Sequence, residues 1–421
     1  MNFIKRNSDY IFTFITEFFI LLAGIFVYKF AANLEGENDF SEYAICRRTI
    51  SFILPLLIMG LGVGIPRYVA FAHDNEKGQS SYFFAGLIIT LTFALPILLI
   101  IYLLKTQFSF LFFGDASFEY LVPSLSLMLI GMLLHALNYG YFRGKIKMHY
   151  ANVFQILNIG IVPLIVFVFF NTVLDVIFYT GLFWLLVSSF FTIYILFSSK
   201  WDLKNLKKSI KELLIYGALR VPGDFVLAGF LAFPAYFTAH MVKDDLETAG
   251  YVAFSMSLLN MVGAAFGPIC LILLPKASII IKNKDFSLLK DQIAKITYWT
   301  FGLTLIGVIV IELFANQIIN IYLGKESVTL IYSIRVTFIA SFGYTIYISL
   351  RSILDAYYVK AVNTINIIIS FAFFIVLQAI SYYFVTNNYV SILYCFVLSM
   401  ILLGILTYYE TKKIITKHHL E

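Results

Sequence analysis

Asp39-Phe40-Ser41-Glu42-Tyr43-Ala44 leads into one long apolar run of this chain, and Glu247-Thr248-Ala249-Gly250-Tyr251-Val252 leads into another. Tyr43 and Tyr251 are about 208 residues apart, and later landmarks recur at nearly the same offset. These landmarks are Pro66-Arg67 with Pro275-Lys276, Phe113-Gly114-Asp115 with Leu323-Gly324-Lys325, and Arg143 with Arg351. The recurrence predicts two homologous halves, an arrangement that membrane transporters often use.

The composition excludes a soluble globular domain. Of 421 residues, 61% are hydrophobic and only 13% are charged, whereas soluble domains contain about 25% charged residues. Apolar windows long enough to cross a bilayer as helices recur along the whole chain. The three cysteines lie within these windows, and none has a ligand partner at metal-site spacing. We therefore expect no disulfide, no metal site and no cofactor, and we assign no metal role to His418-His419.

Hydropathy predicts an all-α polytopic membrane protein with about 12 transmembrane helices. The expected spans are 10–33, 42–70, 82–105, 119–142, 150–170, 174–198, 214–239, 248–281, 293–315, 328–354, 361–385 and 389–411. We divide the chain into an N-terminal six-helix lobe (1–200), an amphipathic cytoplasmic linker (201–213) and a C-terminal six-helix lobe (214–421). The connections are short, so no loop is long enough to hold a soluble catalytic domain.

Lysine and arginine set the expected orientation. Both tails and every second connection are basic, whereas the remaining connections are poor in lysine and mostly acidic. The positive-inside rule then places both termini in the cytoplasm. With six spans in each half, both lobes have the same orientation, which predicts a parallel repeat related by an axis along the membrane normal.

Glycine and proline gather in the second, seventh and eighth spans. In the second span they include Pro55, Gly60, Gly64 and Pro66. Proline bends helices, whereas glycines four residues apart allow close helix packing. Both interpretations, bent cavity-lining helices and close packing, stay open from the sequence.

Ionisable residues within the spans are candidates for function because charge is unfavourable at bilayer depth. They are Glu17, Arg47, Arg48, Arg220, Asp224, Glu312 and Arg335. Arg67, Lys276, Arg143 and Arg351 lie at cytoplasmic span ends, where we expect them to anchor at the interface. His135 is expected to be a hydrogen-bonded core histidine rather than a proton relay.

The arginines suggest an anion site. Arg47 and Arg48 in the second span and Arg335 in the tenth lie near the outer side, and guanidinium groups bind diphosphates through paired hydrogen bonds. Arg220 and Asp224, four residues apart, either neutralise each other or take part in coupling. In the coupling alternative, protonation of Asp224 or Glu17 would release a partner and permit a conformational change.

The order of these motifs resembles the multidrug/oligosaccharidyl-lipid/polysaccharide exporter superfamily, and within it the polysaccharide-unit flippases, including O-antigen flippases. The residues that carry the resemblance are Leu34-x-Gly36-x-x-x-Phe40-Ser41-Glu42-Tyr43, Gly60-Leu61-Gly62 with Ile65-Pro66-Arg67-Tyr68, Phe112-Phe113-Gly114, and Tyr141-Phe142-Arg143-Gly144. Twelve spans argue against the 14-span flippases of peptidoglycan lipid II.

The resemblance implies two six-helix lobes around a central cavity. It also implies a flippase in the bacterial cytoplasmic (inner) membrane that serves lipopolysaccharide or capsule biosynthesis. Its substrate would be an undecaprenyl-diphosphate-linked oligosaccharide, moved to the outer leaflet by alternating access. Arg47, Arg48, Arg220 and Arg335 would bind diphosphate or glycan. The implied partners are this lipid-linked substrate, membrane lipids, H⁺ or Na⁺ as coupling ion, and polysaccharide polymerase machinery; nucleic acid is not expected.

Two alternatives stay open. The first is a cation-coupled multidrug exporter of the same fold, which would favour an acidic cavity. The second is a polytopic glycosyltransferase or polysaccharide polymerase that would use the acidic groups Glu35/Glu37/Asp39 or Asp244/Asp245. Short loops and repeat-equivalent positions favour solvated turns for these acids, so we expect no enzyme activity.

Overall fold

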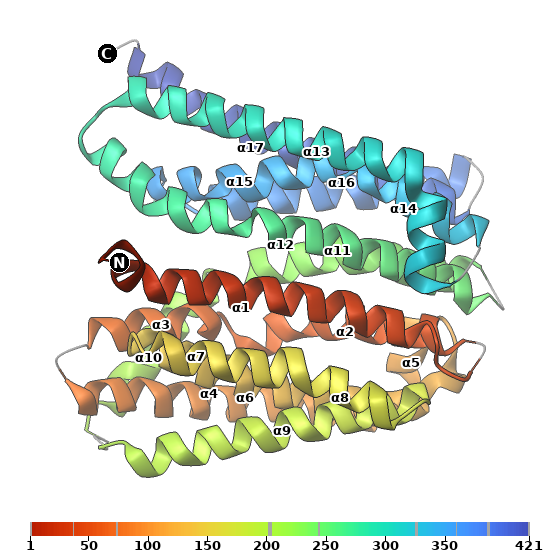
Figure 1. The fold of residues 1–421 in the computed structure, drawn as a ribbon, viewed down its shortest axis with the longest axis horizontal. Coiled ribbons are helices and arrows are strands. Elements are labelled where there is room, and N and C mark those ends of the chain that lie inside the picture. Colours follow the sequence, from red (N-terminus) through yellow and green to blue (C-terminus); the bar gives the residue numbers. More distant parts are fainter. Residues whose placement is uncertain are drawn as a thin grey trace. The chain divides into compact units, whose positions relative to one another are not determined.

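The structure is a computed structural model that describes residues 2–36, 38–72, 75–200, 204–242, 245–324, 327–358, 360–384 and 388–419. Its regular elements are all helical in these ranges (Figure 1). Contacts group the chain into a first unit, Met1–Phe225, and a second unit, Val226–Glu421. The division falls inside one helix, α11 (Val221–Met241).

The first unit contains two six-residue elements of unusual pitch among its α-helices. The 3₁₀-helix is η1 (Ala116–Leu121), and the π-helix is η2 (Ile156–Ile161). The α-helices of this unit are α1 (Asn2–Ala31), α2 (Asp39–Ile58), α3 (Leu61–Phe71), α4 (Glu76–Leu103), α5 (Lys105–Phe113), α6 (Val122–Gly144), α7 (Met148–Gln155), α8 (Val162–Phe169), α9 (Val173–Ser198) and α10 (Leu206–Ala218). Its core forms where α6 packs on α3, α4 and α9.

The second unit is built around α15, which packs against α12, α13 and α17. Beyond the part of α11 that belongs to it, its helices are α12 (Leu246–Lys282), α13 (Phe286–Leu323), α14 (Val328–Ile339), α15 (Ser341–Tyr357), α16 (Val362–Phe384) and α17 (Tyr389–His419). A core of buried apolar side chains, including Leu273, Leu289 and Ile353, joins α12, α13 and α15.

The number of spans agrees with the prediction. Ten stretches in the described residues are long and apolar enough to cross a membrane, and two bent helix pairs raise the number to 12 when each pair is one span. The pairs are α2 with α3, bent by 44°, and α14 with α15, bent by 42°. The predicted fold class, an all-α polytopic membrane protein, is therefore confirmed.

Helix ends repeat in the two halves. Gly114 ends α5 with φ 76°, and Gly324 ends α13 with φ 66°. Glycine adopts this left-handed conformation without the steric penalty of a Cβ atom. Asn75 caps α4 by accepting from the Gly78 amide, and Asp285 caps α13 by accepting from the Leu288 amide. These matched ends support the repeat that the sequence predicts.

The bend between α2 and α3 has a local cause. Met59 and Gly60 both have positive φ, 50° and 71°, so the helix cannot continue through them. A Cβ atom added to Gly60 would lie 2.6 Å from the Gly217 Cα, which shows that α10 approaches α3 backbone to backbone. The glycine- and proline-containing helices α11 and α12 are each one continuous helix, so among these three spans only the second is broken.

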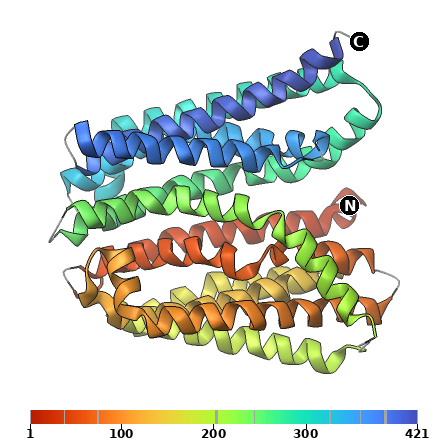
Figure 2. The ribbon, with the colours of Figure 1, turned by 180° about the vertical axis from the view of Figure 1, so that it is seen from behind.

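Helix α10 packs on the first unit. Figure 2 shows it as the light green helix that crosses this side of the unit, where it contacts α3 and α4. Ser209 and Leu213 are buried, Ser209 shares a 3.1 Å hydrogen bond with Ser81, and the Tyr82 hydroxyl donates to Glu212 at 2.5 Å. The apolar side of the predicted amphipathic linker thus contacts other helices, while Lys204, Lys207, Lys208 and Lys211 are exposed. Residues 201–203 of that linker lie outside the described residues.

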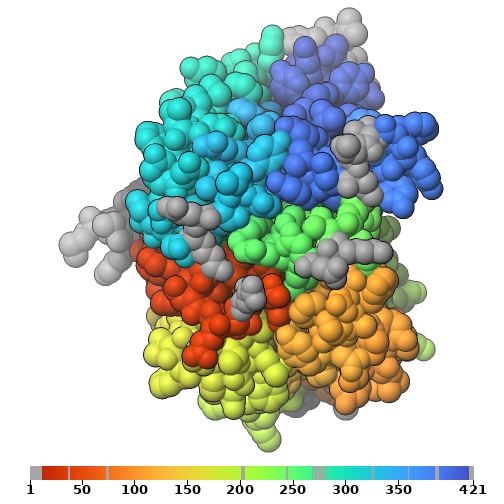
Figure 3. All heavy atoms as spheres, turned by 90° about the vertical axis from the view of Figure 1, so that its right-hand side faces the viewer, coloured from red at the N-terminus to blue at the C-terminus, as the bar shows by residue number. Residues whose placement is uncertain are grey.

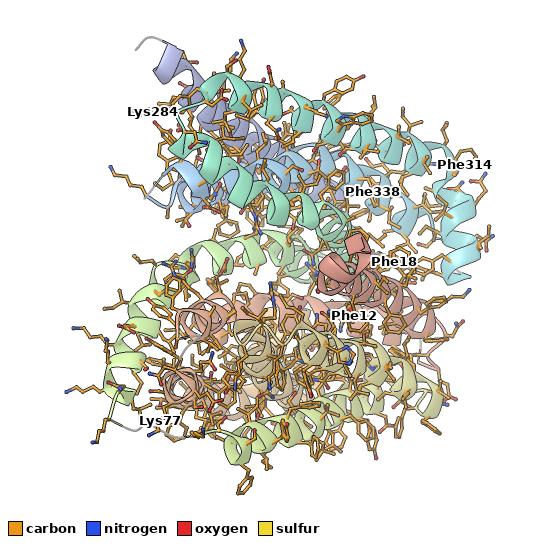
Figure 4. All side chains as sticks on the ribbon, turned by 60° about the vertical axis from the view of Figure 1, so that its left-hand side comes forward. Phe12, Phe18, Lys77, Lys284, Phe314 and Phe338 are labelled. Atoms are coloured by element: carbon orange, nitrogen blue, oxygen red, sulfur yellow. The ribbon has the colours of Figure 1, made fainter. Side chains whose placement is uncertain are left out.

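The opposite end of the first unit is closed by α5 and η1, which Figure 3 shows in orange. The Tyr120 hydroxyl donates to Glu42 at 2.7 Å, which fixes the start of α2. Lys105 donates to Glu119 at 2.8 Å, and this hydrogen bond raises the pKa of Lys105. At the other end Lys77 extends away from the helices (Figure 4).

Close backbone packing in the second unit predicts a sharp difference between two glycine substitutions. A Cβ atom at Gly343 would overlap the Met400 carbonyl oxygen on α17, whereas Gly302 has open space around it. We expect Gly343→Ala to lower the free energy of unfolding by about 1–3 kcal/mol through overpacking. Gly302→Ala should change it by less than about 1 kcal/mol. Thermal unfolding of the purified variants in detergent measures both; an equal effect of the two substitutions would contradict this packing.

Candidate functional site

Glu17 lies on the span part of α1 beside two groups from α6. The Tyr139 hydroxyl donates to the Glu17 carboxylate at 3.5 Å, and the Arg143 guanidinium carbon lies 5.4 Å from the centre of the Tyr139 ring. Arg143 also acts electrostatically on Glu17. Exposed Phe14 and Phe18 flank the carboxylate on α1, and Figure 4 labels Phe18. An acid, a phenol and a guanidinium thus form one cluster on an otherwise apolar surface.

His135 lies directly behind this cluster in a buried polar network. Its ring stacks on Tyr139 at 5.8 Å and on Phe154 at 4.5 Å. Nε2 is 2.8 Å from the Gln155 Oε1 atom, and Nδ1 is 3.1 Å from the Asn158 Nδ2 atom. Because the first partner accepts and the second donates, the imidazole is neutral with its proton on Nε2.

The network continues through α9. Asn158 donates to the Ser188 hydroxyl at 3.0 Å, and the Trp184 indole donates to the Asn158 carbonyl oxygen at 2.6 Å. Asn138 donates to the Ser188 carbonyl oxygen at 2.8 Å. Asn158 lies in the π-helix η2, and such local irregularities are frequent at functional sites.

The expectation that His135 is hydrogen-bonded in the core agrees with these contacts. The sequence analysis did not identify its partners Gln155 and Asn158, although two amide side chains three residues apart in an apolar span were visible in the sequence. They lie 20 and 23 residues from His135 along the chain, and the sequence does not reveal these contacts because they depend on how α6 packs against α7 and η2.

Arg47 and Arg48 have different environments on α2. Arg48 is only 4% exposed, so its guanidinium is enclosed within the protein. Arg47 is partly exposed and hydrogen-bonds the hydroxyl of Tyr28, a buried side chain of α1. Adjacent residues on a helix point about 100° apart, which explains why one is buried and the other is not.

Arg220 does not lie at the level of these two arginines. Its guanidinium carbon is 4.1 Å from the centre of the Tyr216 ring, and Arg67 contacts the same ring at 4.8 Å. Arg67 and Arg48 are roughly 25 Å apart along the α2–α3 pair, at 1.5 Å per residue. One diphosphate cannot bridge that distance, so Arg220 and Arg48 do not form a single anion site in the first unit.

The remaining predicted residues have separate environments. Arg335 on α14 pairs with Glu312 on α13 at 3.9 Å, so a carboxylate already compensates part of its charge. Asp224 is exposed in the first turn of α11, and its amide donates to the Arg220 carbonyl oxygen at 3.1 Å. Negative charge is favourable at this helix position.

Two of the acidic residues considered for an enzyme cap helices, and a third, Glu35, accepts a hydrogen bond from the Asn171 side chain. Asp39 accepts a hydrogen bond from the Val173 amide at 3.2 Å, and Asp245 caps α12 by accepting from the Thr248 amide at 3.1 Å. Glu37 and Asp244 lie outside the described residues. Within the described ranges no three His, Cys, Asp or Glu side chains gather as a metal site would require.

Solved structures with similar folds are transporters. A multidrug resistance MATE family transporter of the MOP superfamily, in an inward-facing conformation, matches with TM-score 0.76 and 15% identity over 95% of each chain. The eukaryotic MATE transporter AtDTX14 matches with TM-score 0.70 and 10% identity over 99% of each chain. A MOP superfamily transporter from Pyrococcus furiosus, whose binding pocket is described as having reverse polarity, matches with TM-score 0.59 and 15% identity over 96% of this chain and 95% of that chain.

No protein-family model and no curated protein sequence matches this chain. The solved structures show that it has the fold of MATE transporters of the MOP superfamily. The resemblance found in the sequence is confirmed at the level of this fold. The similar structures, however, are described as multidrug and MATE transporters, not as polysaccharide flippases.

The buried network predicts that Asn158 is important for stability. Asn158→Ala removes the partner of the His135 Nδ1 atom and of the Ser188 hydroxyl, so we expect the free energy of unfolding to fall by about 1–3 kcal/mol. Asn33→Ala, which removes an exposed amide bonded to the Lys29 carbonyl oxygen, should change it by less than about 0.5 kcal/mol. Thermal unfolding in detergent compares them; equal midpoints would show that the network does not contribute.

Proposed function

We propose that this protein is an ion-coupled exporter that moves small, mainly cationic compounds across the membrane by alternating access. The fold supports transport, and the structural neighbours described as multidrug transporters support this substrate class over a lipid-linked glycan. The alternating charge of the connections supports cytoplasmic termini, and the sequence resemblance supports a location in the bacterial inner membrane.

The observation that carries this proposal is the cluster of Glu17, Tyr139 and Arg143. A carboxylate on a membrane span is unfavourable unless it has partners or a function. When ionised, Glu17 is stabilised by the Tyr139 hydroxyl and by the positive charge of Arg143. When H⁺ or Na⁺ binds, that attraction weakens, so α1 and α6 are no longer held by it and a second conformation becomes accessible.

The His135 network provides the rigid support for this step. Tyr139 stacks on the neutral His135 ring, which is held on both nitrogens. A conformational change at Glu17 would therefore act through Tyr139 on the His135 ring, which its two hydrogen bonds hold in place. Asp224 on α11 is the second acidic group that we propose for coupling, because it lies in the helix that continues into the second unit.

The arrangement of the arginines weakens the flippase interpretation. A diphosphate site made by Arg47, Arg48, Arg220 and Arg335 requires all four near one level. Arg220 instead lies with Arg67, and Arg335 pairs with Glu312. A cationic substrate needs no such arginine group, since exposed aromatic side chains such as Phe14 and Phe18 beside Glu17 bind cations favourably.

Glu17→Gln tests this proposal directly. Glutamine keeps the size and a hydrogen-bond acceptor but cannot lose a proton, so efflux driven by an ion gradient should fall at least about fivefold. The assay uses proteoliposomes loaded with a fluorescent cationic dye, with an H⁺ or Na⁺ gradient imposed separately.

Glu119→Gln is the matched control, because this carboxylate pairs with Lys105 at the outer end of the unit. It should transport as the unchanged protein does. If no cationic dye moves under either gradient, or if Glu17→Gln and Glu119→Gln behave alike, the proposal is wrong.

A second candidate function is the flippase for undecaprenyl-diphosphate-linked oligosaccharides, acting beside polysaccharide polymerase machinery. Two observations favour it: the sequence resemblance to polysaccharide-unit flippases, and the enclosed guanidinium of Arg48 in the second span. Arg47 and Arg48 would then hold the diphosphate.

Arg48→Gln distinguishes this candidate. In proteoliposomes containing lipid-linked oligosaccharide, we expect an active flippase to lose about tenfold or more in transport when one charge-assisted phosphate contact is removed. Arg335→Gln should have a similar effect if it contacts substrate and little effect if it only pairs with Glu312. Sugar accessibility on each leaflet provides the measurement; an unchanged distribution with the native protein excludes flippase activity.

A further inference from the structure

Tyr216 joins two arginines that are far apart in the sequence. Arg67 on α3 lies 4.8 Å from the Tyr216 ring centre, and its Nη1 atom donates to the Tyr216 hydroxyl at 3.3 Å. Arg220, in the turn between α10 and α11, lies 4.1 Å from the same ring centre. Tyr68 packs edge to face on Tyr216 at 5.7 Å, which orients the ring.

Both arginines lie on the surface of the first unit. Arg67 and Arg220 belong to the exposed residues of the first unit. Because each lies over one ring, their guanidinium carbons are at most about 9 Å apart, within the screening length of about 8–10 Å at physiological salt. Two like charges at this distance repel each other, and contact with the ring offsets only part of that repulsion.

The acidic residues on the same helices leave the cluster positive. Glu212, one turn before Tyr216, accepts from the Tyr82 hydroxyl at 2.5 Å and lies 4.0 Å from Lys208. Asp224, one turn after Arg220, carries a single negative charge against two arginines. The group of Arg67, Arg220 and Asp224 therefore retains a net positive charge.

We propose that Arg67 and Arg220 form a binding site for a phosphate group, held in place by Tyr216. Two planar guanidinium groups this close together can each donate paired hydrogen bonds to the oxygens of one phosphate group. Arginine stacked on an aromatic ring loses little further side-chain freedom on binding, which favours affinity. The phosphate belongs either to an anionic membrane lipid or to a soluble diphosphate.

The position of the site gives it a structural consequence. Gly217, next to Tyr216, makes the close backbone contact with Gly60 at the break between α2 and α3. Arg220 immediately precedes α11, the helix that continues into the second unit. A phosphate bound by both arginines therefore ties α3 to the α10–α11 turn and holds the broken span against the linker.

This inference concerns a site separate from the Glu17 cluster and does not depend on the transported substrate. The full-length protein in detergent is titrated with two probes at physiological salt, dioctanoyl phosphatidylglycerol and inorganic diphosphate, with dioctanoyl phosphatidylcholine as the zwitterionic comparison. Arg67→Gln/Arg220→Gln should weaken binding of the phosphate probe at least about tenfold.

Lys207→Gln/Lys211→Gln is the matched control, because it removes two exposed positive charges from the same helix α10. It should change affinity by less than about twofold, since exposed charges beyond the site are screened. Arg67→Lys/Arg220→Lys keeps the charge but loses the planar fork, so its affinity should lie between those of the native protein and the glutamine variant. It also provides the test if the glutamine variant does not fold.

Each result has one meaning. Selective loss of phosphatidylglycerol binding supports a lipid headgroup as the ligand, and selective loss of diphosphate binding supports a soluble anion. Equal weakening by the arginine and lysine variants, equal affinity for phosphatidylcholine and phosphatidylglycerol without diphosphate binding, or no binding of either anionic probe by the native protein overturns the proposal.

Discussion

Hydrocarbon offers no hydrogen bonds, and this constraint determines most of the structure. Each backbone amide and carbonyl group in a span needs a partner within the protein, so the spans are helical. The same constraint acts on side chains: Ser257, Thr407 and Thr411 each donate to the carbonyl oxygen four residues earlier. Polar groups without such a local partner, such as His135 and Asn158, are found together in one network. The site and the scaffold thus follow from one requirement.

The sequence predicted the parts of the structure that depend on local pattern. Apolar runs gave the 12 spans, and Gly114 and Gly324 marked equivalent helix ends. The arrangement of the charged residues depended on contacts between distant helices and was not predictable in the same way. Arg67 was expected to be an interface anchor, yet it shares Tyr216 with Arg220, because α10 returns to pack on α3 and α4.

The two halves share a repeated pattern of helices, but the helices are interrupted at different places in each half. The first half bends at Met59–Gly60, whereas the repeat-related helix α12 is assigned without interruption. The second half bends at Ala340 between α14 and α15, whereas α6 continues through the related position. No proline marks the second break, so this break was not predicted from the residues. Repetition therefore supplies the framework, and single residues within each half make the halves different.

The hydrogen bond from Trp184 to Asn158 makes the polar network visible to spectroscopy. The chain has three tryptophans, and of these Trp184 is 1% exposed while Trp299 is 58% exposed. Indole emission depends on the polarity and hydrogen bonding around the ring. With Trp201 and Trp299 replaced by phenylalanine, the intrinsic fluorescence of Trp184 becomes an internal reporter for the surroundings of His135, without an attached dye.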